Sequence, residues 1–168
     1  MRRAATRGKM PDMKPYHLAP EQGHAVWNSG GLMTFKATGA DTSGRFWLME
    51  YLVGPGTTVP LHSHAGEDQA WYVIEGELRC TVGEASFRAQ PATFVYVPRG
   101  VLHGLTAETS SARLLVLGTP SGAEHFYWET GEPAGALTLP PCQLLLDPDR
   151  LAAACATYGV QLADRSAL

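Results

Sequence analysis

Residues 56–76 read GTTVPLHSHAGEDQAWYVIEG and contain two histidines, His62 and His64, that are separated by a single residue. The apolar and β-branched residues before them predict a strand over Val59–His64, in which alternate side chains point to the same face. The two imidazoles are therefore expected one pleat repeat apart, close enough to converge on a single ion. A His-x-His pair also occurs on exposed strand faces, so its meaning depends on the surrounding residues.

A third histidine follows a bend further along the chain. Residues 98–103 read PRGVLH, and the proline and glycine predict a turn that presents His103 from a different part of the sheet. Three nitrogen ligands suit first-row transition metals, so three imidazoles that meet inside one fold would form a metal site. The alternative is a set of unmetallated polar residues in a ligand pocket.

The central region has the pattern of an all-β protein. Glu75-Gly76 and Gly83-Glu84 have the chemistry of two-residue hairpin turns, and no predicted helix separates the short apolar runs around them. This punctuation predicts a sandwich or barrel. The predicted strands cover Leu32–Thr38, Arg45–Val53, Val59–His64, Ala70–Ile74, Leu78–Val82, Ala85–Ala89, Thr93–Val97 and Ala112–Leu117.

The regions outside these strands divide the chain into three parts. Residues 1–15 are charged and lack apolar periodicity, which predicts a flexible tail, and the barrel is expected to occupy residues 16–145. Within the latter, Glu124–Trp128 is predicted as a further strand or a short helix, and residues 131–141, rich in Gly, Ala and Pro, as an extended surface arm.

The last part, residues 146–168, is predicted to form a C-terminal helix packed on the barrel. Asp147 can cap it, Pro148 suits its first turn, Arg150–Tyr158 is rich in Ala and Leu, and Gly159 stops it.

Composition excludes several classes of function. A chain of 168 residues fits one domain, and its net charge of −3, without a long basic run, argues against a nucleic-acid or anionic-membrane partner. There is no apolar run that could span a bilayer and no secretory signal, so a cytoplasmic location is expected. Cys80, Cys142 and Cys155 lack CxxC spacing and are interpreted as inert thiols.

Two spaced motifs together resemble those of the cupin family: Gly56-x5-His62-x-His64-x4-Gln69-x6-Gly76, and Ala92-x5-Pro98-x-Gly100-x2-His103. The resemblance implies a double-stranded β-helix, the cupin jelly-roll barrel, here followed by a short C-terminal helix. It is much less informative about the reaction, because this fold hosts many.

The resemblance also implies one divalent transition metal ion, which can be Zn, Fe, Ni, Cu, Co or Mn. Its ligands would stand at the family positions occupied here by His62, His64, Gln69 and His103. The family usually has Glu where this chain has Gln69, and an amide oxygen is neutral and almost non-basic. The substitution should weaken metal retention, make a bound ion a stronger Lewis acid, and remove a proton acceptor. Ala92 and Ala107 replace the usual Gly and Asn.

Other polar residues near the motifs are interpreted as structural or solvated. Glu67 and Asp68 could in principle replace the missing carboxylate, but both are expected in a loop that faces water. Arg99 could anchor an anion at the mouth of the site, although a surface role is favoured. His17 and His24 are expected to be exposed, and His125 to be a packing residue in an aromatic segment.

A substrate pocket can be outlined from strand alternation. If Gln69 points inward, Trp71 and Val73 should as well, unless they are plain core residues. Met49 and Tyr51 are further pocket candidates, although both faces of their strand are apolar and the pattern does not show which faces inward. An apolar, aromatic cavity would favour an organic substrate with rings.

Three functions remain open at this stage, and no catalytic residue is identified. The chain resembles small bacterial cupins related to flavonol dioxygenases, which implies a quercetinase-like reaction of a small aromatic or enolic substrate. A second possibility is an isomerase, cyclase or lyase that uses the metal as a Lewis acid, and a third is a non-catalytic small-molecule binder. The resemblance also implies a homodimer formed through the N-terminal strands.

Overall fold

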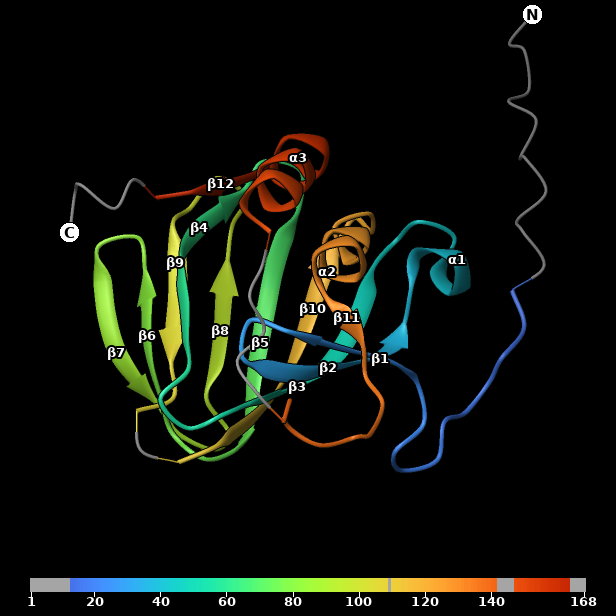
Figure 1. The fold of residues 1–168 in the computed structure, drawn as a ribbon, viewed down its shortest axis with the longest axis horizontal. Helices are drawn as coiled ribbons and strands as arrows, with labels where there is room; N and C mark the ends of the chain where they lie inside the picture. The colour runs from blue at the N-terminus through green and yellow to red at the C-terminus, as the bar shows by residue number, and fades with distance from the viewer. Residues whose placement is uncertain (1–12, 109, 142–146, 164–168) are drawn as a thin grey trace, which may run out of the picture.

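The computed structural model describes residues 13–108, 110–141 and 147–163, and they form two antiparallel sheets (Figure 1). The seven-stranded sheet has the order β11 (Glu132–Pro133), β1 (His24–Asn28), β2 (Gly31–Ala37), β3 (Trp47–Val53), β10 (Ala112–Thr119), β5 (Asp68–Glu75) and β8 (Phe94–Val97). The five-stranded sheet has the order β12 (Val160–Leu162), β4 (Thr58–His64), β9 (His103–Thr106), β6 (Leu78–Val82) and β7 (Ala85–Ala89). The prediction of a mostly β, double-stranded β-helix is confirmed.

The hydrophobic core lies between the two sheets and is built by strict alternation. In β3, Trp47, Met49, Tyr51 and Val53 are buried and the residues between them are half-buried. The paired strand β10 alternates in the same way. The sequence left open which of the two apolar faces of β3 points inward. The structure answers this question, because the face that carries the buried residues lies against the opposite sheet.

Several short strands lie outside the predicted set. β1, β9, β11 and β12 contain between two and five residues each. Pairing with neighbouring strands, which the local sequence does not reveal, makes these segments strands.

Three helices complete the described part of the chain: α1 (Gly39–Thr42), α2 (Glu124–Thr130) and α3 (Pro148–Tyr158). α2 decides between the two predicted alternatives for its segment in favour of a helix. α3 has the expected boundaries, because the Asp147 carboxylate accepts from the N–H of Asp149 and Gly159 ends the helix with a φ of 67°. None of the helices in the described residues is long and apolar enough to cross a membrane.

The chain does not end with this helix. β12 follows α3 directly and pairs with β4, so that Val160 lies opposite His64 and Leu162 opposite His62. Figure 1 shows β12 alongside β4, with α3 above the same end of the molecule. The C-terminal segment therefore adds a strand to the sheet that carries the first two histidines.

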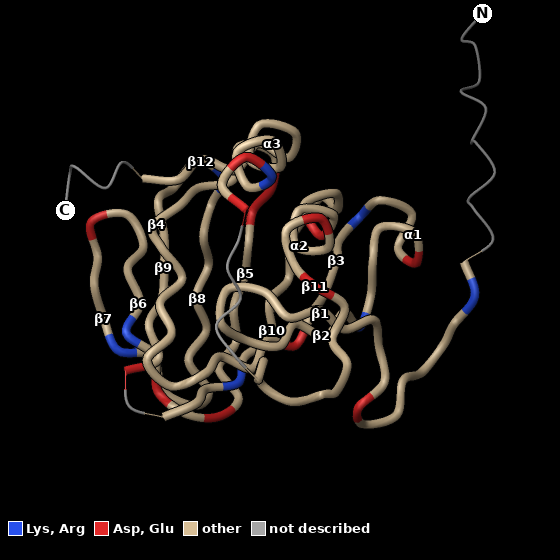
Figure 2. Tube along the Cα trace, in the orientation of Figure 1, with Lys and Arg blue, Asp and Glu red and all other residues tan. Residues whose placement is uncertain are grey.

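The structure describes only some of the residues for which the sequence predicted a flexible tail and inert thiols. Most of the predicted N-terminal tail (residues 1–12) and Cys142 lie outside the described residues. Of the other two cysteines, Cys80 is buried, and burial raises the pKa of its thiol to about 11, as expected for an inert side chain. Figure 2 shows charged residues spread over turns, strand ends and the helices α1, α2 and α3.

Gly118 on β10 allows the Trp47 side chain to pack directly against the backbone. A Cβ atom at this position would lie 2.2 Å from Cε2 of Trp47, a side chain with no exposed surface. Gly118→Ala should therefore lower the free energy of unfolding by about 1–3 kcal/mol, as measured by chemical denaturation. Gly66→Ala is the matched control, because no atom lies within 4 Å of its added Cβ. Equal stability of the two variants would contradict this packing.

Candidate metal centre

Strands β4 and β9 bring three histidines together. In their antiparallel ladder the Cα of His62 lies opposite that of His103, after a register shift that follows Val59. The ring centroid of His62 is 4.3 Å from that of His103 and 5.0 Å from that of His64. One nitrogen atom from each ring lies within 4.8 Å of the others, a spacing that allows one ion to contact all three.

The turn before β9 fixes the third ring relative to the first two. The N–H of Val101 donates to the carbonyl of Pro98 at 3.2 Å, and Gly100 has a φ of 76°, which favours glycine. The N–H of Gly100 also donates to the carbonyl of His64 at 2.8 Å. This bond joins the turn to β4, so the Pro-Gly bend presents His103 as the sequence predicts.

The surroundings of the rings determine which nitrogen atoms are free. Nδ1 of His62 lies 2.9 Å from the carbonyl oxygen of Pro60, and Nδ1 of His103 lies 2.9 Å from that of Val101. A carbonyl only accepts, so both Nδ1 atoms carry the proton and both Nε2 atoms keep a lone pair. Nε2 of His103 is buried and has no hydrogen-bond partner in the described part of the chain. An ion in this position would satisfy it, so the donor set fits a metal.

Burial keeps the three rings neutral. Desolvation lowers the pKa of His64 to about 3, helped by His62 and His103, and lowers the pKa of His103 to about 4. It also lowers the pKa of His62, against the opposing effect of the bond to Pro60. Neutral imidazole is the form that binds metal ions, so at neutral pH the triad is ready to coordinate without losing protons.

Gln69 lies beside the triad with a defined amide orientation. Its Nε2 donates to a carboxylate oxygen of Glu67 at 2.8 Å and lies 3.1 Å from Nε2 of His64. Its Oε1 accepts from the indole N–H of Trp71 at 3.2 Å. The amide nitrogen, not the oxygen, therefore faces the rings. A role for Gln69 as a metal ligand stays a prediction, and it would require the amide to turn its oxygen away from Trp71.

Glu67 is buried, in contrast to the expectation of a solvated loop residue. Only 4% of its surface is exposed, because the loop between β4 and β5 folds inward at this residue. One carboxylate oxygen accepts from Gln69 and the other from the indole N–H of Trp47 at 2.7 Å. Desolvation raises the pKa of Glu67 to about 7, against the effect of these two hydrogen bonds. The first carboxylate oxygen lies 3.4 Å from Nδ1 of His64.

Asp68 and Arg99 form a structural pair at the rim. The Asp68 carboxylate accepts from Nε of Arg99 at 3.0 Å, from its Nη2 at 3.1 Å and from its backbone N–H at 2.9 Å. The hydrogen bonds from Arg99 hold the pKa of Asp68 below its usual range. This pair joins the turn before β9 to the start of β5, so the guanidinium of Arg99 is already engaged by an anion of the chain itself.

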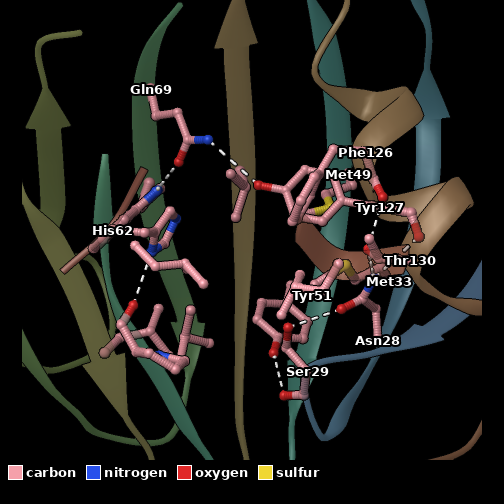
Figure 3. Close-up of a pocket in the computed structure, with 17 residues that line it drawn as sticks. Asn28, Ser29, Met33, Met49, Tyr51, His62, Gln69, Phe126, Tyr127 and Thr130 are labelled. Atoms are coloured by element: carbon pink, nitrogen blue, oxygen red, sulfur yellow. Dashed lines mark hydrogen bonds between the residues drawn. The ribbon is translucent and has the colours of Figure 1, made fainter. Parts of the chain in front are cut away.

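A cavity of about 140 Å³ opens beside the triad. Figure 3 shows His62 and Gln69 on one side of it and Met49, Phe126 and Tyr127 on the other. Its walls are mostly apolar, and its lining residues include the predicted Met49, Tyr51 and Trp71, but not Val73, which is a core residue with 1% exposure. The lining comprises Asn28, Ser29, Met33, Met49, Tyr51, Val59, Pro60, His62, Gln69, Trp71, Leu105, Val116, Phe126, Tyr127, Thr130, Leu151 and Leu162.

Most polar groups of the cavity wall are already bonded to one another. Asn28 donates to the carbonyl of Tyr127 and to Oγ1 of Thr130, and accepts from the hydroxyl of Ser29. The hydroxyl of Tyr51 donates to the carbonyl of Ser29 at 2.9 Å. A ligand therefore meets polar groups mainly at the end of the cavity that holds His62, Gln69 and the Tyr127 hydroxyl.

Helices α2 and α3 supply cavity residues that sequence reasoning missed. Phe126 and Tyr127 come from α2, and Leu151 comes from α3, which was expected only to pack on the outside. The Tyr127 hydroxyl lies 3.4 Å from Nε2 of Gln69, and burial raises the pKa of this tyrosine. The aromatic run in residues 124–128 was the sequence signal for these cavity residues. It suggested only packing, because the sequence does not show which part of the fold this segment contacts.

The remaining histidines do not join the triad. His17, His24 and His125 are exposed, and none belongs to the cluster of potential ligands in the described residues. His125 was expected to pack, and it does so only at the surface, where its ring makes an edge contact with Trp128 at a centroid distance of 4.8 Å.

Two facing antiparallel sheets with three imidazoles converging beside an apolar cavity define a double-stranded β-helix protein with a candidate metal centre. Residues 49–118 match the family model described as the cupin domain, and this span includes all three histidines. This part of the chain is therefore similar to the cupin domain, and the fold is similar to that of a solved cupin.

Known relatives and structures agree with this assignment. An uncharacterized protein of Streptomyces coelicolor is 28% identical over 108 residues, which are 64% of this chain and 97% of that protein. KdgF from Halomonas sp. superposes with a TM-score of 0.58 at 17% identity, over 66% of this chain and 99% of that one. An RmlC-like cupin from Shewanella frigidimarina gives a TM-score of 0.57 at 17% identity, over 67% and 98% of the two chains. These structural likenesses show the fold alone.

The depressed histidine pKa values give a pH prediction for the metal-free protein. The ring signals of His64 and His103 should titrate in NMR spectra below pH 5, whereas an unperturbed histidine titrates near 6.5. Because the unfolded chain takes up protons first, these two rings support the folded state fully above pH 6.5 and lose that contribution as the pH falls, toward about 4 for His103 and about 3 for His64. Midpoints near 6.5 for both rings would show that they are solvated instead.

Proposed function

We propose that this cupin is a metal-dependent enzyme that acts on a small aromatic or enolic substrate. The observation that carries the proposal is the position of the triad, because His62 belongs both to the cluster of potential ligands and to the cavity wall. His62, His64 and His103 would hold the ion. When bound there, a divalent ion would supply Lewis-acid chemistry to a substrate oxygen at the polar end of the cavity.

The residues of the chain then divide the remaining tasks. Trp71, Met49 and Phe126 would pack against the apolar part of the substrate and exclude water from it. The Tyr127 hydroxyl and the Gln69 amide would orient a polar substituent beside the triad. Their pairing with each other already holds both groups in place.

The size of the cavity refines the substrate class. A cavity of about 140 Å³ is comparable to one that accommodates benzene, so it fits a single ring or a short branched chain. The quercetinase-like reaction that the sequence resemblance implies uses a three-ring flavonol. We therefore favour a one-ring phenol or a compact enol over a flavonol.

A reaction without dioxygen is the second candidate, and the chemistry of the cavity wall favours it. Among the described residues no Asp or Glu lines the cavity, so a carboxylate that could take a proton directly from the substrate is lacking there. A neutral set of ligands leaves a bound ion its full charge and makes it a stronger Lewis acid, which suits polarisation of a carbonyl in an isomerase, cyclase or lyase step. Dioxygen uptake separates the two reactions, and tight ligand binding without turnover would favour a non-catalytic binder. The homodimer and the cytoplasmic location stay predictions.

The metal site is tested by removing its ligands one at a time. His62→Ala and His103→Ala should each abolish stoichiometric metal in protein purified without added metal, measured by elemental analysis, because two imidazoles hold an ion far more weakly than three. His125→Ala is the control, since this exposed ring lies outside the cluster and the variant should keep its metal. Full metal content in both triad variants would refute the site.

The substrate class is tested by filling the cavity. Val116→Phe places a larger side chain on the cavity wall and should weaken binding of a one-ring probe such as catechol at least tenfold, as measured by calorimetry. Leu115→Phe is the matched control, because the neighbouring side chain on β10 points to the other face. Both variants should keep the metal content of the wild type. Binding of a flavonol more tightly than of any one-ring probe would contradict the proposed size limit.

A further inference from the structure

The three histidines differ in what lies behind them. The Nδ1 atoms of His62 and His103 each face a backbone carbonyl, Pro60 and Val101 respectively, at 2.9 Å. Nδ1 of His64 faces no carbonyl and has no hydrogen-bond partner in the described residues. The polar group in front of it is the Glu67 carboxylate, at 3.4 Å.

The tautomer of His64 follows from its other neighbour. The Gln69 amide nitrogen, 3.1 Å away, can only donate, so Nε2 of His64 is the atom with the lone pair. In the neutral ring the proton is then on Nδ1, the atom that faces Glu67. All three rings thus keep the lone pair on Nε2, two because Nδ1 faces a backbone carbonyl, and His64 because its Nε2 accepts from Gln69.

Glu67 is held in this position by the core. Its second oxygen accepts from the indole of Trp47, which is fully buried, and its first oxygen accepts from Gln69. The carboxylate is 4% exposed and is not among the groups that line the cavity. A buried carboxylate costs free energy unless it is paired, and a cation in the triad would provide the missing opposite charge.

We propose that Glu67 is an anionic positioning residue of the metal centre, which orients His64 through Nδ1 and places a negative charge beside an otherwise neutral set of ligands. The inference rests on the proposed metal site. A carboxylate behind a metal-binding imidazole fixes the ring and raises its basicity, and loss of such a group typically weakens metal affinity 10- to 100-fold. An ion on Nε2 of His64 would replace the Gln69 N–H as the partner of that lone pair, while Gln69 would keep its bond to the carboxylate.

The test is a set of cobalt affinities, measured by chelator competition and by the visible spectrum of bound Co²⁺. Glu67→Gln keeps the shape of the side chain but removes its charge, and should raise the Kd for Co²⁺ about 10- to 100-fold, with a shifted Co²⁺ spectrum. Asp68→Asn is the matched control, because it removes the adjacent charge, which is bonded to Arg99 rather than to the triad. The control should stay within about threefold of the wild type.

A second variant separates charge from shape. The double substitution Glu67→Gln with Gln69→Glu moves the carboxylate by two residues and keeps the total charge, so it should recover most of the lost affinity. If Glu67→Gln alone does not fold, Glu67→Asp replaces it in the comparison. That variant keeps the charge, and its Kd should stay within about tenfold of the wild type. Loss of the charge is expected to raise the Kd by up to about 100-fold.

The outcomes distinguish this inference from the proposed function. Wild-type affinity in Glu67→Gln, an equal loss in Asp68→Asn, or a double variant as weak as Glu67→Gln would overturn the role of Glu67 while leaving the triad intact. If Glu67→Asp loses as much Co²⁺ affinity as His62→Ala, the role of Glu67 is likewise overturned. Absence of Co²⁺ binding by the wild type would overturn the metal site, and the inference with it.

Discussion

The antiparallel ladder between β4 and β9 is the constraint on which the candidate site depends. It sets the Cα of His62 opposite that of His103, and pairing of β4 with β12 on its other edge keeps this strand inside the sheet. The positions of the rings are thus determined by backbone hydrogen bonds, which side-chain substitutions nearby hardly disturb. The bond from Gly100 to the carbonyl of His64 adds a further link across the same strands.

The side chain of Trp47 connects the hydrophobic core with the candidate metal centre. Gly118 leaves the space that Trp47 occupies, and the indole of Trp47 donates to the Glu67 carboxylate. Glu67 in turn contacts Gln69 and faces His64. A close contact in the middle of the sheet therefore helps to hold the groups around the triad.

The cavity combines an apolar wall with a polar end that lacks a carboxylate among the described residues. Met49, Trp71 and Phe126 favour a hydrophobic ligand body, whereas His62 and Gln69 offer neutral polar groups. The acidic group of the region, Glu67, lies behind the rings instead of in front of them. In the proposed function such a site would suit a compact ligand with one oxygen near the ion, because the charge of Glu67 would lie beside the ion and not contact the ligand.

The sequence by itself determined the resemblance to cupins, the all-β character of the fold and the three histidines that meet, because those signals are local: alternation, turn residues and fixed spacing. It also predicted the helix capped by Asp147. Only the tertiary structure decided that Glu67 is buried, that Gln69 turns its nitrogen to the rings, and that helices α2 and α3 line the cavity. These features depend on contacts with Trp47, β12 and the opposite sheet, and such long-range contacts leave no periodic trace in the residues that make them.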